Sequence, residues 1–536
     1  MSRFPFADET LLFQPAEPLS SALAVVFAFP NQYSVGITSL GYQVIWKNLA
    51  QRRDVAVARL FTDYQEPLPS SPDLLGFSLS WELDYGNLLD LLDRLQIPLY
   101  ARDRDSHHPI VFGGGPVLTA NPEPFADFFD VVLLGDGETL VDSFLDRMLD
   151  LRTADRSDQL RHLAQVPGVY VPSLYQVTYD GPEGSVVAIQ PIIPEVPAMV
   201  TKQTYRGEVL SASTVVTPHA AWENIFMVET VRSCPEMCRF CLASYLTLPF
   251  RPANLEDFLI PTIDQGLAVT DRLGLLGASV TQHPEFDSLM DHLNQPQYDS
   301  IRLSLASVRT NTVTPKLAQT LTRHGTRSIT IAIESGSERV RAIVNKKLAS
   351  EAIQAAAINA RSGGLKAMKL YAMVGVPGES PADLEVTVNL LTQIKKTTPG
   401  LRLTLGCSTF VPKAHTPFQW VGVNPEAQQR LKYLQRQLAK NGIEFRPESY
   451  SWSAIQALIA RGDRRLTPLL IQVRQYGDSL GSYKRAFKDR RGQLPPLDFY
   501  VHEFWNRDQP LPWDHLLGPL PKATLQKHLE SSQDLW

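Results

Sequence analysis

The chain has 536 residues, of which 44% are hydrophobic and 20% charged, and a formal net charge of −5. This is an ordinary globular composition; the length predicts two to four domains, and the charge gives no general attraction to nucleic acid or anionic membranes. No apolar run reaches the about 18 residues of a membrane span, and acidic residues stand where a signal peptide needs an apolar core. We therefore expect no membrane partner and a cytoplasmic location.

The first 150 residues alternate strand and helix patterns after an irregular arm of 20 residues. Apolar strand patterns alternate with helical ones at 41–53, 85–95 and the end of 130–149; the strands are expected at 21–30, 54–62, 74–80, 109–117 and the start of 130–149. This alternation predicts a doubly wound parallel sheet for 1–150. Glycines at 113–115 and 135–137 follow two of these strands, where they either admit a ligand or only form turns. No G-x-G-x-x-G opens a helix, so we expect no dinucleotide site.

The next segments are a connector and a second α/β region. Residues 151–222 predict a linker with a β-hairpin formed by 166–179 and 184–196. From 223 to 423 six strand patterns alternate with helical ones; the strands are expected at 224–230, 273–280, 300–308, 327–334, 367–376 and 402–411. One long helix is expected over 337–362. Six such units are typical of an incomplete (β/α)6 barrel, in which function lies in the loops after the strands.

Three of the four cysteines lie within eight residues, in the stretch VRSCPEMCRFCL. Cys234, Cys238 and Cys241 form a C-x3-C-x2-C motif in the loop after the first barrel strand. Thiolates bind soft or borderline metals, and three of them leave one coordination position open. A structural zinc site normally has four ligands, and His219 and His283 supply no nearby pair. An iron–sulfur cluster with three protein ligands fits the spacing better than zinc.

The motif, with Phe240 before its last cysteine, resembles the signature of radical S-adenosylmethionine (SAM) enzymes. The resemblance implies that the three cysteines hold a [4Fe-4S] cluster whose fourth iron binds SAM. Reductive cleavage of SAM then starts radical C–H chemistry, with a flavodoxin-like or ferredoxin-like protein as one-electron donor. The substrate stays open between RNA and a small molecule, and methyl or methylthio transfer is an analogy. The alternative is a non-catalytic iron–sulfur or SAM-binding module with a sensing role.

The N-terminal region resembles the cobalamin-binding-type domain that precedes the barrel in one radical SAM subgroup. The stretches GFSLSWELDYGN, GGGPVLTANPEPFADFFD and GDGE carry this resemblance. The D-x-H-x-x-G motif that supplies a histidine to cobalt is absent, because PNQYSVGITSLG follows the first strand. Either cobalamin binds without a protein imidazole, or the domain works without cobalamin.

The resemblance also implies cofactor-binding residues at the ends of the other barrel strands. The segment Glu334, Ser335 and Gly336 matches the part of the family that binds the SAM ribose and methionyl group; its alternative role is a helix cap. The G-x-P-G-E turn that follows the fifth strand matches one beside the adenine, or else only leads into a helix. The candidates in this turn are Gly375, Pro377, Gly378 and Glu379. At the ends of the second and third strands the candidates are Gly277, Ser304 and Arg309.

Polar candidates also occur after the sixth strand and in the C-terminal region. Lys413 and His415 are candidates for a substrate-binding or catalytic role, whereas Cys407 reads as a packing thiol. Residues 424–490 predict helices, and the arginines within 461–465 either meet phosphate or RNA, or form ion pairs at a solvated helix end. Residues 491–536 are rich in proline and tryptophan, so we expect a tail docked on the core.

Overall fold

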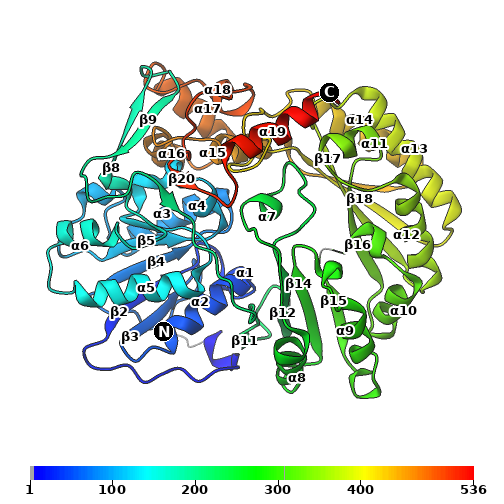
Figure 1. Ribbon diagram of the computed structural model, residues 1–536, viewed down its shortest axis with the longest axis horizontal. Coiled ribbons are helices and arrows are strands. Elements are labelled where there is room, and N and C mark those ends of the chain that lie inside the picture. The colour runs from blue at the N-terminus through cyan, green and yellow to red at the C-terminus, as the bar shows by residue number, and fades with distance from the viewer. Residues whose placement is uncertain (1–4, 307) are drawn as a thin grey trace.

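The computed structural model describes residues 5–306 and 308–536, so the first four residues of the expected arm and Ser307 of the third barrel strand lie outside it. Two α/β halves lie side by side, the N-terminal half in blue and cyan and the barrel half in green and yellow (Figure 1). Among the described residues, no helix combines the length and the apolar character needed to cross a bilayer.

The N-terminal half is built on a six-stranded sheet with the order β3-β2-β4-β5-β6-β7, in which only β7 is antiparallel. Its strands are largely buried, as expected for a parallel sheet covered on both faces. Right-handed crossovers that run in opposite directions from β2 and β4 place helices on both faces and leave a crevice between these strands. The strands are β2 (Leu23–Ala28), β3 (Val55–Leu60), β4 (Leu74–Ser78), β5 (Ile110–Gly114), β6 (Val131–Leu133) and β7 (Val169–Tyr170), and the main helices are α2 (Leu40–Ala50), α3 (Tyr85–Arg94), α4 (Pro116–Ala120), α5 (Gly137–Asp150) and α6 (Arg156–Leu163).

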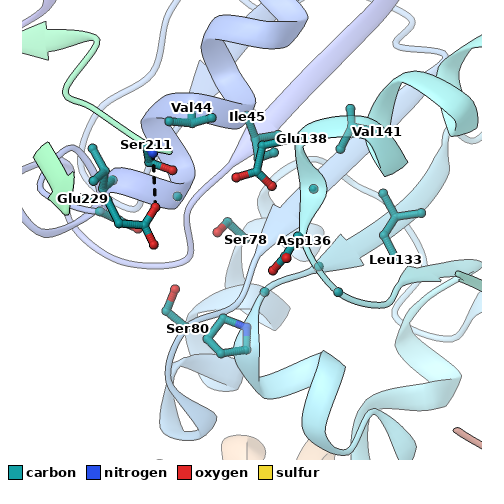
Figure 2. Close-up of a pocket in the computed structure, with 18 of the residues that line it drawn as sticks. Val44, Ile45, Ser78, Ser80, Leu133, Asp136, Glu138, Val141, Ser211 and Glu229 are labelled. Carbon is teal, nitrogen blue, oxygen red and sulfur yellow. Dashed lines mark hydrogen bonds between the residues drawn. The ribbon is translucent and has the colours of Figure 1, made fainter. Parts of the chain in front are cut away.

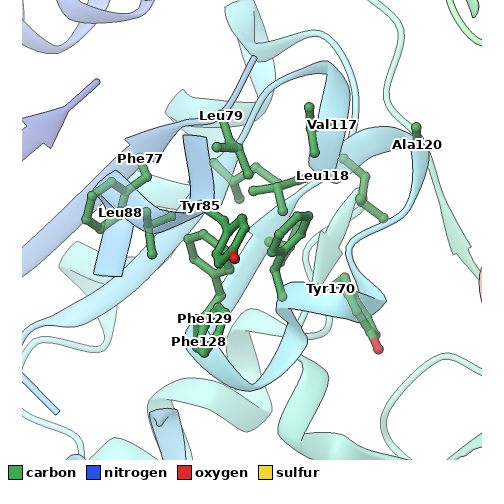
Figure 3. Packing of buried hydrophobic residues seen from close by; sticks show 14 of the residues in the cluster. Phe77, Leu79, Tyr85, Leu88, Val117, Leu118, Ala120, Phe128, Phe129 and Tyr170 are labelled. Carbon is green, nitrogen blue, oxygen red and sulfur yellow. The ribbon is translucent and has the colours of Figure 1, made fainter. Parts of the chain in front are cut away.

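Aromatic rings fill the space between this sheet and its helices (Figure 3). A side chain at Gly76 would overlap the ring of Phe112, and one at Gly113 would overlap Leu118 and Phe129. Phe112 in turn packs on Phe144 with ring centroids 5.0 Å apart. Gly76 and Gly113 therefore allow close packing of aromatic side chains on opposite faces of the sheet.

Short strands connect the two halves. The predicted hairpin forms from β8 (Tyr175–Tyr179) and β9 (Val186–Pro191), while β1 (Thr10–Leu11) pairs with β11 (Val215–Val216). A further parallel pair joins β10 (Val200–Thr201) to β20 (Leu516–Leu517) near the end of the chain.

The second half contains the six parallel strands expected for an incomplete barrel. With two added edge strands, antiparallel β13 and parallel β19, they form two four-stranded sheets, β13-β12-β14-β15 and β16-β17-β18-β19, joined by a bridge between Val308 and Ile331. The expected helix over 337–362 is two helices with a break between them. The strands are β12 (Ile225–Arg232), β13 (Arg251–Pro252), β14 (Arg272–Gly277), β15 (Arg302–Leu305), β16 (Ser328–Glu334), β17 (Ala367–Val374), β18 (Arg402–Thr409) and β19 (Glu444–Pro447), and the helices are α7 (Leu242–Tyr245), α8 (Ile260–Leu267), α9 (Phe286–Leu293), α10 (Pro315–Arg323), α11 (Glu338–Ile343), α12 (Ser350–Ser362), α13 (Pro381–Thr397) and α14 (Ala427–Lys440).

The C-terminal helices pack largely on the N-terminal half, although α15 (Tyr450–Ala460) also contacts strand β18 of the barrel (Figure 1). Leu470, Tyr500 and Trp513 belong to the same buried cluster as Tyr85 and Phe125, whereas the barrel has its own cluster. The last helix then crosses to contact α11 of the barrel. These helices are α15 (Tyr450–Ala460), α16 (Leu466–Gln475), α17 (Leu480–Asp489), α18 (Leu497–Val501) and α19 (Lys522–Gln533).

Candidate functional site

The cysteine motif forms a tight loop between β12 and α7. Ser233 and Met237 adopt φ angles of 70° and 56°, a conformation that non-glycine residues rarely adopt and that clusters at functional sites. The Ser233 hydroxyl donates to the carbonyl of Ala243 at 2.9 Å, and the Cys234 amide donates to the same oxygen at 3.2 Å. The loop thus closes on itself around the three thiols.

The neighbouring helix holds the loop from outside. The Arg239 guanidinium donates to the carbonyls of Ala342 and Ile343, at the C-terminal end of α11, where a cation is favoured. The Asn345 side chain donates to the carbonyl of Met237 at 2.8 Å. The Tyr245 hydroxyl lies 3.2 Å from that same carbonyl. Together these contacts fix the loop relative to the barrel.

The three cysteines share one cavity of about 240 Å³ above the barrel strands. Cys234 and Cys238 are 8% and 6% exposed. The other walls come from the ends of β14, β15 and β16, the break after α11, and β17. They include Phe240, Ala278, Ser279, Val308, Arg309, Thr310, Thr330, Ala332, Glu334, Lys346, Leu348 and Tyr371. These strand ends are where a β/α barrel places its function.

The donor set of this cavity fits a cluster better than a single ion. Burial raises the pKa of Cys238 to about 12 and also raises that of Cys241, so these thiols need a metal to become thiolates. In the part of the chain that the structure describes, no three His, Cys, Asp or Glu side chains are arranged to hold one metal ion. The thiolates that hold an iron–sulfur cluster bind separate irons, so they stand farther apart than the ligands of a single metal ion. The Ser244 hydroxyl, buried in the cavity wall, has no hydrogen-bond partner among the residues that the structure describes.

Charged groups face the thiols across the cavity. Glu334 lies at a bulge that ends β16, with a φ of 63°, and its carboxylate accepts from the Lys346 ammonium at 2.9 Å. Arg309 pairs with Glu236 of the cysteine loop at 3.3 Å. The site therefore offers a carboxylate and two cations beside the cysteines. Sequence reasoning missed Lys346, because the predicted long helix would have carried it away from the cavity.

The remaining predicted cofactor residues lie outside this cavity. Gly277 has a φ of 151°, and a Cβ there would lie 2.6 Å from the carbonyl oxygen of Val231, so the position requires glycine. It lines a different cavity. Ser304 is exposed on β15. The Ser335 carbonyl accepts from Arg341, and the Gly336 amide donates to Thr387 at 3.0 Å.

The G-x-P-G-E turn also makes structural contacts. The Glu379 carboxylate accepts from the Gly375 amide at 2.6 Å and pairs with Arg430 at 2.7 Å. Pro377 lies in the same turn, and a Cβ at Gly378 would lie 2.7 Å from the Cα of Trp536. The C-terminal residue thus covers this turn.

The polar pair after β18 lies between the two halves and not at the cysteine cavity. Lys413 forms an ion pair with Glu82, whose carboxylate also accepts from Gln456 at 3.0 Å. His415 is buried against the N-terminal half, and burial lowers its pKa to about 4. Cys407 is buried in the barrel core, as predicted for a packing thiol.

The arginine segment 461–465 is buried, which corrects the expectation of a solvated helix end. Arg461 is 0% exposed and donates to the carbonyl of Tyr500 at 2.8 Å. Arg464 pairs with buried Glu123 at 3.2 Å, and Arg465 pairs with Asp463 at 2.6 Å. These groups join the C-terminal helices to the N-terminal half and offer no surface for RNA.

Comparisons with known proteins agree with this architecture. Residues 42–172 match the family model of the N-terminal region of radical SAM proteins, and residues 228–391 match that of the radical SAM superfamily. The uncharacterized protein MJ0966 of Methanocaldococcus jannaschii is 26% identical over 484 residues, which are 90% of this chain and 96% of that protein.

Two solved structures show the same fold at low identity. One is the radical SAM methyltransferase TsrM from Kitasatospora setae with cobalamin and a [4Fe-4S] cluster bound, with a TM-score of 0.50, 12% identity, and coverage of 96% of this chain and 99% of that one. The other is the cobalamin-dependent radical SAM enzyme OxsB with aqua-cobalamin and SAM bound, with a TM-score of 0.50, 12% identity, and coverage of 95% and 79%. The predicted layout, a parallel α/β sheet before an incomplete barrel, is confirmed. The chain belongs to the radical SAM superfamily, in the subgroup with an N-terminal domain, and is an enzyme of the radical SAM type, a family that implies a [4Fe-4S] cluster and SAM.

Proposed function

We propose that Cys234, Cys238 and Cys241 hold the [4Fe-4S] cluster and that SAM binds beside it in the cavity of about 240 Å³. The observation that carries this proposal is the convergence of three thiols, two of them on buried residues, with one carboxylate and two cations on one cavity at the strand ends. A cluster held by these cysteines would supply one electron for cleavage of the SAM sulfonium to methionine and a 5′-deoxyadenosyl radical, which would abstract hydrogen from a C–H bond of the substrate.

The charges of the cavity match the polar ends of SAM. The Lys346 ammonium, 2.9 Å from Glu334, is placed to bind the methionyl carboxylate. The Glu334 carboxylate has a second oxygen for ribose hydroxyls, and Arg309 supports the wall opposite. The fixed geometry of this pair positions SAM without reorganisation when it reacts.

The substrate is proposed to be a small molecule. Of the arginines that would have met RNA, Arg461 is buried and Arg464 and Arg465 are held in ion pairs, and the net charge of −5 gives no attraction to a polyanion. The electron is proposed to come from a flavodoxin-like or ferredoxin-like donor. Cys407 is the one cysteine outside the motif, and a single cysteine cannot hold a second cluster.

Anaerobic reductive cleavage of SAM tests the proposal. Reconstituted protein with SAM and dithionite is expected to release 5′-deoxyadenosine, measured by mass spectrometry. Cys234→Ala is expected to lose both iron and product, whereas the matched control Cys407→Ala, which removes the thiol outside the cavity, keeps both. Folded protein that carries a cluster and binds SAM but releases no 5′-deoxyadenosine would instead support a sensing module.

A further inference from the structure

A second and larger cavity, of about 470 Å³, lies between the two halves. It opens at the C-terminal ends of β2, β4, β5 and β6, in the crevice where the strand order of the N-terminal sheet reverses. Ligands of open α/β sheets bind at such positions. The barrel closes its far side with residues of β12 and β14, including Glu229, Arg232, Leu276 and Gly277. Nothing in the proposed SAM site accounts for this cavity.

The cavity does not fit a corrinoid. Cobalamin is a macrocycle with a nucleotide tail, much larger than the drug-sized molecules that cavities of this volume enclose. On the two faces of the sheet next to the cavity, the ring of Phe112 covers Gly76 and the ring of Phe129 covers Gly113, so neither face leaves room for a nucleotide tail. Among the described residues that line the cavity there is also no histidine to bind cobalt.

Its walls are apolar and its charged rim is acidic. Phe27, Phe77, Ile45, Leu133 and Val141 form apolar walls, with Ser78 and Ser80 near the floor (Figure 2). Neither of these two hydroxyls makes a hydrogen bond to a described residue of the protein. An apolar cavity with a few placed polar groups is the usual form of a small-molecule site.

The rim carries more carboxylates than cations. The carboxylates of Asp136, Glu138 and Glu229 surround the same space (Figure 2). Arg232 bridges Glu138 at 2.6 Å and Glu229 at 2.7 Å, and Arg251, outside the cavity, pairs with Asp136 at 2.6 Å. Asp136 is neutralised by Arg251 and has the Lys202 ammonium nearby, whereas Glu138 and Glu229 share the single cation Arg232. The Glu138–Glu229 pair therefore keeps one negative charge. A cation or strong hydrogen-bond donor is favoured there, and an anion is not.

The two cavities meet at the end of one strand. Leu276 and Gly277 line the larger cavity, while the next residues along the chain, Ala278 and Ser279, line the cysteine cavity. A side chain at Gly277 would collide with Val231 between them. A molecule held in the larger cavity therefore lies next to the place where the radical is proposed to form.

We propose that this cavity is the substrate site, and that it takes a mainly apolar molecule with a cationic or hydrogen-bond-donating head in place of a corrinoid. The inference rests on the proposed function, because it assigns the substrate class of that reaction. The apolar body packs against the phenylalanine walls, and the head meets Glu138 and Glu229.

The site can be blocked at one glycine without strain. A Cβ at Gly114, on β5, meets only Leu133, at 3.7 Å or more, whereas one at Gly115 would collide with the backbone of Leu79. Gly114→Leu should therefore fill the cavity and leave the sheet intact. Gly481→Leu is the matched control, because that position is also open and lies on α17, away from the cavity.

Binding to the full-length protein is measured by calorimetry with three probes: 2-naphthylethylamine, 2-naphthylacetate and hydroxocobalamin. The amine is expected to bind about tenfold or more tightly than the carboxylate, which corresponds to about 1.4 kcal/mol. Gly114→Leu should weaken amine binding at least about tenfold, and Gly481→Leu should not. Glu138→Gln should reduce the preference for the amine, while Asp142→Asn, on the same helix outside the cavity, should keep it.

Three results would overturn the inference: equal affinity for the two naphthyl probes, amine binding insensitive to Gly114→Leu, or stoichiometric hydroxocobalamin binding lost in that variant. These outcomes are separate from a failure of the proposed function. If the wild-type protein binds the amine but forms no 5′-deoxyadenosine, only the proposed chemistry is contradicted. If it cleaves SAM but shows no preference for the amine, only the substrate assignment is contradicted.

Discussion

Lys346 is the residue on which the proposed SAM site most depends. It is mostly buried, it pairs with Glu334 at 2.9 Å, and it lines the same cavity as the three cysteines. Lys346→Met removes the proposed partner of the SAM carboxylate and leaves Glu334 without its cation. We expect SAM affinity to fall by about tenfold to a hundredfold, as for loss of one charge-assisted contact, with iron content unchanged.

The neighbouring lysine supplies the control for this prediction. Lys347 is 61% exposed at its side chain and lies 4.0 Å from Glu236, so Lys347→Met should bind SAM as the wild type does. Equilibrium binding of SAM to reconstituted protein measures both variants. Equal affinities for the two would remove Lys346 from the site.

The difference between the cysteines and Lys346 shows what sequence reveals at this scale. Three thiols within eight residues form a local pattern, so their shared loop is predictable from spacing alone. Lys346 reaches the cavity only because the helical pattern breaks at Asn345, which has a φ of 56°. Asparagine tolerates this conformation better than most residues, and it was the one signal in the sequence for the break.

At the scale of elements, the ion pair between Arg464 and Glu123 joins α16 to the loop after α4. Glu123 is 1% exposed and also accepts from the Tyr170 hydroxyl at 2.5 Å. Arg464→Met leaves this carboxylate buried without its cation, which costs about 3–5 kcal/mol of unfolding free energy. Urea denaturation should show this loss.

Two further variants separate the pair from side-chain packing. The double variant with Glu123→Gln should recover part of the stability, because no buried charge is left unpaired. Arg446→Met breaks an exposed pair with Glu444 and should change stability by less than about 1 kcal/mol. A small loss in Arg464→Met, equal to that in Arg446→Met, would contradict the assignment of this contact.

The elements that sequence analysis missed are short or depend on distant partners. β13 has two residues and β19 four, too few for a periodic pattern, and each exists because it extends an edge of a barrel sheet. The six barrel strands were predictable because each is an apolar run followed by a helical one. The contact of α16 with the N-terminal half has no local signal, since its partners lie over 300 residues apart.

At the scale of the whole molecule, the two halves meet around buried neutral histidines. Burial lowers the pKa of His515 to about 4, and the same cause lowers that of His415 to about 4. Glu123 lies 3.6 Å from His515, but Arg464 already neutralises this carboxylate. Lys202 is the other nearby charge and disfavours a further cation.

These histidines should make the assembly of the two halves sensitive to acid. In the unfolded chain each histidine is protonated below its ordinary pKa of about 6.5, whereas in the folded chain it stays neutral down to about pH 4. Stability is therefore complete above pH 6.5 and falls as the pH drops towards 4, by about 3 kcal/mol for each histidine. Denaturant unfolding between pH 7 and 5 measures this loss.

His515→Gln, which stays neutral, should reduce the loss by about 2 kcal/mol. His107→Gln changes an exposed histidine and should lose stability with acid as the wild type does. An unchanged acid loss in His515→Gln would mean that other groups carry the pH dependence.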